Sequence, residues 1–218
     1  MRGLLIKDTK LLLQQKRFFV LMFIIAIMLN VNGSGTFVIS YLTFLCTTVG
    51  LSTISYDEFD NGYAFLFTLP VERRTYAREK YIFSIILGVL AWIVGVLVTI
   101  PVQMYQKADF VMTDSLVEAV ALLPCLFIIL SFMIPILLKF GGEKGRTVML
   151  ASIGIIFVAV FALVKLNEVL HVDWNKIFCM LPTMSIELIL SVAFAAAIVI
   201  MAVSVVVSAK IMEKKVFY

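Results

Sequence analysis

The run that decides the fold is Tyr81–Gln103, YIFSIILGVLAWIVGVLVTIPVQ, which contains no charged residue. An α-helix needs about 20 consecutive apolar residues to cross the hydrocarbon core of a bilayer, so this run is long enough to span a membrane. Five other apolar stretches accompany it, and the first of them is short for a full crossing. The six predicted spans are Phe18–Val31, Thr36–Ser55, Tyr81–Gln103, Val117–Leu138, Val148–Leu166 and Leu188–Ala209.

The composition of the whole chain agrees with this interpretation. Of its 218 residues, 62% are hydrophobic and 15% are charged, and the mean hydropathy is +1.08. Soluble domains are about half apolar and about a quarter charged, so this chain could not cover a soluble surface with polar groups. We therefore predict an all-α integral membrane protein whose residues 1–218 form one transmembrane domain. In a membrane protein, the net charge of +4 reflects the orientation of the chain in the membrane, and we expect no nucleic-acid partner.

The basic residues predict the orientation of the chain. With six spans, both termini lie on the same side of the membrane. That side carries fifteen of the Lys and Arg residues, and the other side carries only Lys107, Lys165 and Lys176. Because cytoplasmic loops are enriched in Lys and Arg, both termini and the polar segment 56–80 are predicted to be cytoplasmic.

The residues before the first span, 1–17, have a helical pattern of their own. At helical spacing, a basic and polar stripe separates from most of the leucines, although Asp8 and Gln15 interrupt the pattern. This favours an amphipathic helix that lies at the cytoplasmic interface, and a solvated basic tail is the alternative. The stripe consists of Lys7, Lys10, Gln14 and Arg17, and the leucines are Leu4, Leu5, Leu11 and Leu12.

Segment 56–80 concentrates charged and aromatic residues between the second and third spans. Acidic side chains follow the second span, an aromatic patch comes next, and Pro70 precedes a basic stretch that leads into the third span. Aromatic anchors surrounded by charges are typical of protein interfaces, so this segment is a candidate docking site for a cytoplasmic partner. The alternative is a connector whose aromatic side chains lie on lipid headgroups. The candidate contact residues are Tyr56, Asp57, Glu58, Phe59, Asp60, Tyr63, Phe65 and Phe67.

Segment 167–187 is the longest predicted external loop. Its mixed apolar character suggests that it dips into the membrane or lies on it. His171 and Asp173 could bind a metal or sense pH, but the chain has one histidine and no second ligand nearby, so a surface histidine without such a role is favoured. The residues singled out here are His171, Trp174, Phe178, Pro182 and Glu187.

No catalytic pattern is visible in the sequence. The glycine-rich stretch Gly141–Gly145 lacks both the preceding strand and the Lys-Ser/Thr pair of a phosphate-binding loop. No nucleophile elbow or metal-ligand spacing is present, so we expect neither an enzyme nor a cofactor on this chain. The spans also lack acidic residues at mid-membrane depth, which argues against ion-coupled transport. If the protein moves a substrate, its energy should come from elsewhere.

Two motifs resemble those of the small permeases of the ABC type-2 exporter family. One is the loop motif, which comprises Ser55–Ala64 (SYDEFDNGYA), Thr68–Val71 (TLPV), Arg73-Arg74 and Lys80-Tyr81, and the other is the N-terminal motif Gly3–Asp8 (GLLIKD). The resemblance implies six spans, a dimer with a second permease copy and a separate cytoplasmic ATPase subunit that binds ATP and Mg²⁺. It also implies a coupling helix near residues 57–69, an N-terminal interfacial helix and a re-entrant external gate around residues 167–187.

Within that family the chain most resembles bacterial permeases that export amphipathic cytolytic peptides of the phenol-soluble-modulin kind. The expected function is therefore that of a multi-pass permease in the bacterial plasma membrane that exports amphipathic or hydrophobic peptides. Two other classes remain open. A non-transporting immunity or sensor protein could bind a toxic peptide without an ATPase. A membrane-embedded enzyme would need paired carboxylates or histidines at membrane depth, which this sequence lacks.

Overall fold

The computed structural model describes residues 1–32, 35–59, 62–106, 112–142 and 185–215, together with 144–145, 147–148, 150–151, 154, 161 and 165. The regular elements in these ranges are helices, and no strand occurs among the described residues. They are α1 (Arg2–Gln14), α2 (Lys16–Asn32), α3 (Gly35–Glu58), α4 (Gly62–Leu66), α5 (Arg73–Gln106), α6 (Met112–Phe140) and α9 (Ile186–Lys214).

Four of these helices are long and apolar enough to cross a membrane: α3, α6, α9 and the Arg73–Tyr105 part of α5. A fifth crossing is possible if α1 and α2, which meet at a bend of 66°, act as one broken span. The described helices therefore confirm an all-helical protein with four to five candidate spans. The predicted fifth span, 148–166, falls mostly outside the described residues, so six spans remain a prediction.

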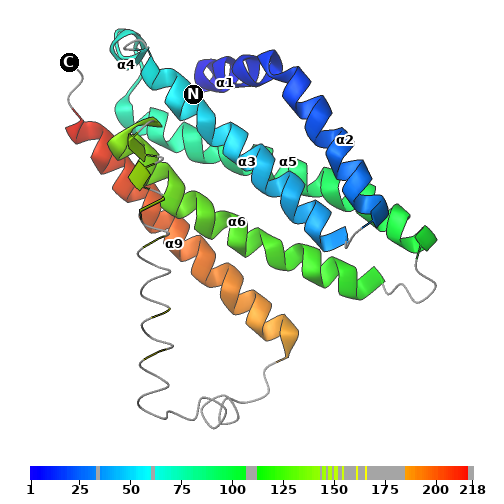
Figure 1. Cartoon of the computed structure of the whole chain (residues 1–218). Helices are drawn as coiled ribbons and strands as arrows, with labels where there is room; N and C mark the ends of the chain where they lie inside the picture. Colours follow the sequence, from blue (N-terminus) through cyan, green and yellow to red (C-terminus); the bar gives the residue numbers. More distant parts are fainter. Residues whose placement is uncertain are drawn as a thin grey trace.

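The long helices run side by side, and one end of the bundle gathers several chain segments (Figure 1). Helix α3 packs most extensively on α5, and α6 packs most extensively on α9. The short helix α4, the N-terminus and the C-terminal end of α9 lie at the same end, which we call the α4 end. Which side of the membrane this end faces rests on the charge argument.

Small residues allow α3 and α5 to approach closely, as is common between membrane helices. A Cβ atom on Gly88 of α5 would lie 2.9 Å from the Thr47 hydroxyl oxygen, and one on Gly95 would lie 3.2 Å from the Cα atom of Ile39. Polar side chains add hydrogen bonds between α5 and α9. The Tyr81 hydroxyl lies 2.6 Å from the Ser204 Oγ and 2.8 Å from the Ser208 Oγ.

The N-terminal residues form the helix α1, which is separate from α2. Leu4, Asp8 and Leu12 follow one stripe of α1 and are buried, so this stripe faces the bundle. Ile6 and Leu13 are exposed on its other sides. Contact with α3 and α5 of the bundle therefore holds α1 in place. Its position at the membrane interface remains a prediction.

Candidate functional site

The predicted docking segment forms the turn between α3 and α5 at the α4 end (Figure 1). Its aromatic residues divide into two groups. Tyr56, Phe59 and Phe65 are outward, with exposed fractions of 51%, 72% and 73%. Tyr63 is 4% exposed, and it packs with the partly buried Phe67 in the core cluster of this end. The outward group is available to a partner, and the inward group fixes α4 to the bundle.

The inward group is an aromatic cluster of Tyr63, Phe67 and Tyr76. The ring of Tyr63 stacks on Phe67 with centroids 6.3 Å apart. Both rings form T-shaped contacts with the ring of Tyr76, with centroids 5.8 and 5.9 Å apart. The Tyr63 hydroxyl donates to the carbonyl oxygen of Ile54 at 3.4 Å. Burial raises the pKa of this hydroxyl, so it remains a neutral donor. Aromatic contacts of this kind add to the energy of area burial, which holds α4 in one position.

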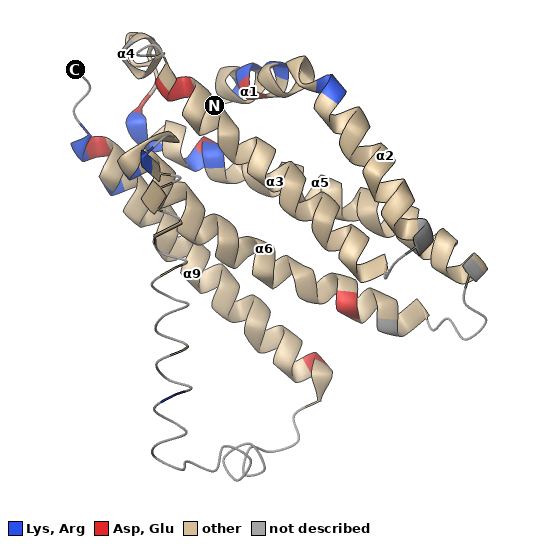
Figure 2. Cartoon of the chain, in the orientation of Figure 1, with Lys and Arg blue, Asp and Glu red and all other residues tan. Residues whose placement is uncertain are grey.

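A buried ionic cluster lies beside these rings. Lys80 on α5 is 1% exposed, and its Nζ contacts the carboxylates of Asp8 on α1 and Asp57 on α3, the latter at 2.8 Å. Lys7 pairs with the same two carboxylates. The Tyr76 hydroxyl donates to Asp57 Oδ2 at 2.8 Å. Figure 2 shows charged residues gathered at this end of α1, α3, α5 and α9.

This ionic cluster joins three helices that are far apart in sequence. A buried charge whose partner is removed is strongly destabilising, because the remaining charge has lost both water and its counter-ion. The Glu79 carboxylate, 0% exposed, adds a further acidic group 4.0 Å from Lys80. Movement of α1 away from α3 and α5 would therefore separate buried opposite charges.

The cluster also brings together the two motifs that the sequence showed. Lys7 and Asp8 end the N-terminal motif, whereas Asp57 and Lys80 belong to the loop motif. Sequence reasoning placed Asp57 among the residues that contact a partner, but its side chain is only 7% exposed and lies inside the cluster. Its inward position indicates that it holds the segment in shape. Lys7, Asp8, Tyr76 and Lys80 were not predicted as site residues.

The remaining candidate residues lie elsewhere. Glu58 is partly exposed and contacts the turn after α6. Glu187 is in the first turn of α9, at the opposite end from α4, where a carboxylate interacts favourably with the positive end of the helix dipole. Asp60 and the proposed external-gate residues His171, Trp174, Phe178 and Pro182 lie outside the described residues.

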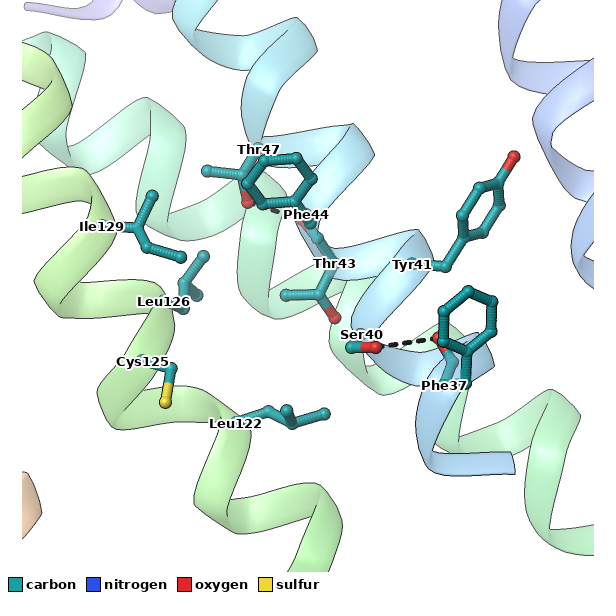
Figure 3. Close-up of a pocket in the computed structure, with 10 residues that line it drawn as sticks. All are labelled: Phe37, Ser40, Tyr41, Thr43, Phe44, Thr47, Leu122, Cys125, Leu126 and Ile129. Atoms are coloured by element: carbon teal, nitrogen blue, oxygen red, sulfur yellow. Dashed lines mark hydrogen bonds between the residues drawn. The ribbon is translucent and has the colours of Figure 1, made fainter. Parts of the chain in front are cut away.

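A pocket between α3 and α6 is a feature that sequence reasoning did not identify (Figure 3). Its volume is about 380 Å³. The hydroxyls of Ser40, Thr43 and Thr47 donate to carbonyl groups of their own helix, so the wall presents mainly apolar atoms. Its lining residues are Phe37, Ser40, Tyr41, Thr43, Phe44 and Thr47 on α3, and Leu122, Cys125, Leu126 and Ile129 on α6. Within the described part of the chain, no group of three or more His, Cys, Asp or Glu residues could hold a metal ion.

Comparison with known proteins adds one family. Residues 3–213 match the family model described as ABC-2 family transporter protein. No curated protein and no solved structure matches the chain. The match covers nearly the whole chain, including the N-terminal motif, the loop motif and the four candidate spans. The chain therefore belongs to the ABC-2 family of transporter proteins.

Proposed function

We propose that this chain is the membrane-embedded permease subunit of an ATP-binding-cassette exporter, driven by a separate cytoplasmic ATPase. Family membership supports a transporter whose membrane subunit carries no catalysis. The observation that carries the docking proposal is the exposed pair Phe59 and Phe65 on a segment that is fixed from behind by buried aromatic and ionic contacts.

The division of the segment into outward and inward side chains suits a docking site. Large aromatic side chains provide much of the binding energy at protein interfaces, and truncation of one such anchor costs about 2 kcal/mol or more. A rigid support reduces the ordering cost of binding. It also lets a force on the outward face reach the spans, since α3 ends and α5 begins at this segment.

The proposed substrate is an amphipathic or hydrophobic peptide, exported by two permease copies that form a homodimer or a heterodimer. The apolar wall of the α3–α6 pocket supports this class, because a strongly charged substrate would find no complementary charge there. The buried charges of the described spans are paired at the α4 end, in the ionic cluster.

Co-purification tests the docking proposal. The full-length tagged chain is expressed with each candidate ABC-type ATPase of the same organism, and ATPase recovery is measured in detergent. Phe59→Ala and Phe65→Ala should each weaken the complex by about 2 kcal/mol, which is roughly 30-fold in affinity. Phe132→Ala is the matched control, because Phe132 is 62% exposed but lies within the span of α6. Equal ATPase recovery from all three variants would contradict docking at this segment.

Substrate class is tested separately with the assembled complex in lipid nanodiscs. A synthetic amphipathic helical peptide should stimulate ATP hydrolysis, and a charged peptide of equal length without an apolar face should not. Stimulation by neither peptide would count against a peptide substrate, while intact ATPase recovery would leave the permease proposal standing. A wild-type chain that recovers no ATPase would favour the non-transporting alternative.

A further inference from the structure

Glu58, the last residue of α3, connects the docking segment to two other helices. The backbone N–H of Gly142, just after α6, donates to Glu58 Oε2 at 2.5 Å. Lys215, just after α9, lies with its Nζ 3.8 Å from Glu58 Oε1 and donates to the carbonyl oxygen of Leu138 at 3.0 Å. Burial lowers the pKa of Lys215, and the nearby Glu58 carboxylate opposes that shift. One side chain thus contacts the ends of both α6 and α9.

The glycines after α6 make this contact possible. Gly141 has a φ of +81°, and a Cβ atom there would lie 2.1 Å from both carboxylate oxygens of Glu58. A Cβ atom on Gly142 would lie 2.6 Å from the Cβ of Ser55. No other residue type fits the first position without strain and collision. The Gly141-Gly142 pair therefore has a structural explanation that requires no phosphate ligand.

The other flank of the docking segment reaches the same place. Arg73, the first residue of α5, donates from one guanidinium nitrogen to the carbonyl oxygens of Lys215 at 2.8 Å and Glu213 at 3.0 Å. The last carbonyls of a helix have no partner within the helix and lie at the negative end of its dipole, so a cation binds them well. Both flanks of the docking segment are thus attached to the C-terminal end of α9.

We propose that these contacts transmit movement of the docking segment to α6 and α9, with Glu58 as the positioning residue. We call Glu58, Arg73, Lys215 and the Gly141-Gly142 turn the C-terminal clamp. Helices α3 and α5 flank the docking segment directly in the chain, and they move with it for that reason. Helices α6 and α9 have no chain connection to the segment there, so they depend on packing and on the directional contacts of the clamp. This inference rests on the proposed ATPase docking.

The test separates docking from transmission. Glu58→Ala removes both clamp contacts of the side chain, whereas Glu58→Gln keeps an oxygen that can accept from the Gly142 N–H. Spin labels are placed at Val20→Cys on α2 and Lys210→Cys on α9, in full-length chains whose native cysteines are replaced. The distance between the labels is measured in nanodiscs with the bound ATPase, first without nucleotide and then with ATP and vanadate.

The expected result is a nucleotide-dependent change in the label distance for the wild type and for Glu58→Gln. In Glu58→Ala, measured on the complexes that retain the ATPase, the change should fall by at least half. An undiminished distance change in Glu58→Ala, or no change in the wild type, overturns the inference. The inference is also overturned if Glu58→Ala loses the ATPase as completely as Phe65→Ala does, since Glu58 would then be a docking contact. Failure of the wild type itself to recover the ATPase contradicts the proposed function instead.

Discussion

Lys80→Met should be among the most destabilising single substitutions at the α4 end. Lys80 is 1% exposed, its Nζ pairs with Asp8 and Asp57, and it also donates to the Thr53 hydroxyl at 3.1 Å. Methionine has a similar length but leaves two buried carboxylates with Lys7 as their common cation. Removal of one partner from a buried ion pair costs about 3–5 kcal/mol, so we expect a loss of that size.

A second substitution shows whether unpaired charge is the cause. Asp8→Leu alone should also cost about 3–5 kcal/mol, because it removes a buried partner of Lys80 and leaves Asp57 at 2.8 Å and the more distant Glu79 at 4.0 Å. In the double variant, Asp57 keeps Lys7 and Tyr76 as partners. The double variant should therefore cost about 2 kcal/mol less than the sum of the two single losses, within the range of coupling between contacting residues.

The assay is reversible unfolding of the full-length protein by sodium dodecyl sulfate in mixed micelles, followed by tryptophan fluorescence. Lys10→Met is the control, because Lys10 is an exposed lysine on α1, the helix that carries Asp8. It should change the free energy of unfolding by less than about 0.5 kcal/mol. The reasoning is refuted if Lys80→Met lowers the free energy of unfolding by less than about 1 kcal/mol. It is also refuted if the effects of Lys80→Met and Asp8→Leu are additive in the double variant.

Two other substitutions test the packing of the spans in the same unfolding assay. Tyr81→Phe removes the hydroxyl that contacts Ser204 and Ser208. It should lower the free energy of unfolding by about 1 kcal/mol, the usual size of a hydrogen bond between membrane helices. An unchanged free energy of unfolding would mean that this contact is not formed. Gly88→Val places new atoms against α3 and should lower the free energy of unfolding by about 1–3 kcal/mol through overpacking. Gly3→Ala is the control, because its new Cβ atom would meet nothing within 4 Å, and it should be neutral or slightly stabilising. Equal effects of the two substitutions would contradict close packing at Gly88.

The spans were predictable because the apolar runs exceed the length that a bilayer requires. The described helices α3, α5, α6 and α9 each contain one predicted span. An amphipathic interfacial helix over residues 1–17 was expected from the helical spacing of the basic and polar residues. The structure has the helix α1 at Arg2–Gln14, and its interfacial role stays a prediction. The ends of the helices were harder to predict. Helix α5 begins at Arg73, eight residues before the predicted span, because the basic residues after Pro70 are also helical.

The candidate site was only partly predictable. Composition located the segment 56–80, but not which way each side chain points. Asp57 and Phe59 are two residues apart, yet one is buried and the other is 72% exposed, because the rotation of α3 against α1 and α5 decides their directions. The pairing of Asp8 with Lys80 crosses 72 residues of sequence. The sequence gives one indication of this pairing: charged residues that lie close to apolar helices need partners of opposite charge.

The basic residues of the segment show the same limit. The sequence explained Arg73 and Arg74 by topology alone, as residues that remain on the cytoplasmic side. The structure adds that Arg73 binds the final carbonyls of α9 and that Arg74 pairs with Glu213. Local sequence could not predict these contacts, because the end of α9 lies about 140 residues further along the chain.

Photo-crosslinking from position 65 tests the central claim most directly. The photoreactive residue p-benzoylphenylalanine replaces Phe65 in the full-length chain, and the same residue replaces Phe132 in the control. Both chains are irradiated in membranes that contain the candidate ATPase used for co-purification. The account predicts a covalent permease–ATPase product from position 65 and none from position 132. A product from neither position, or from position 132 alone, would contradict docking of the ATPase on this segment.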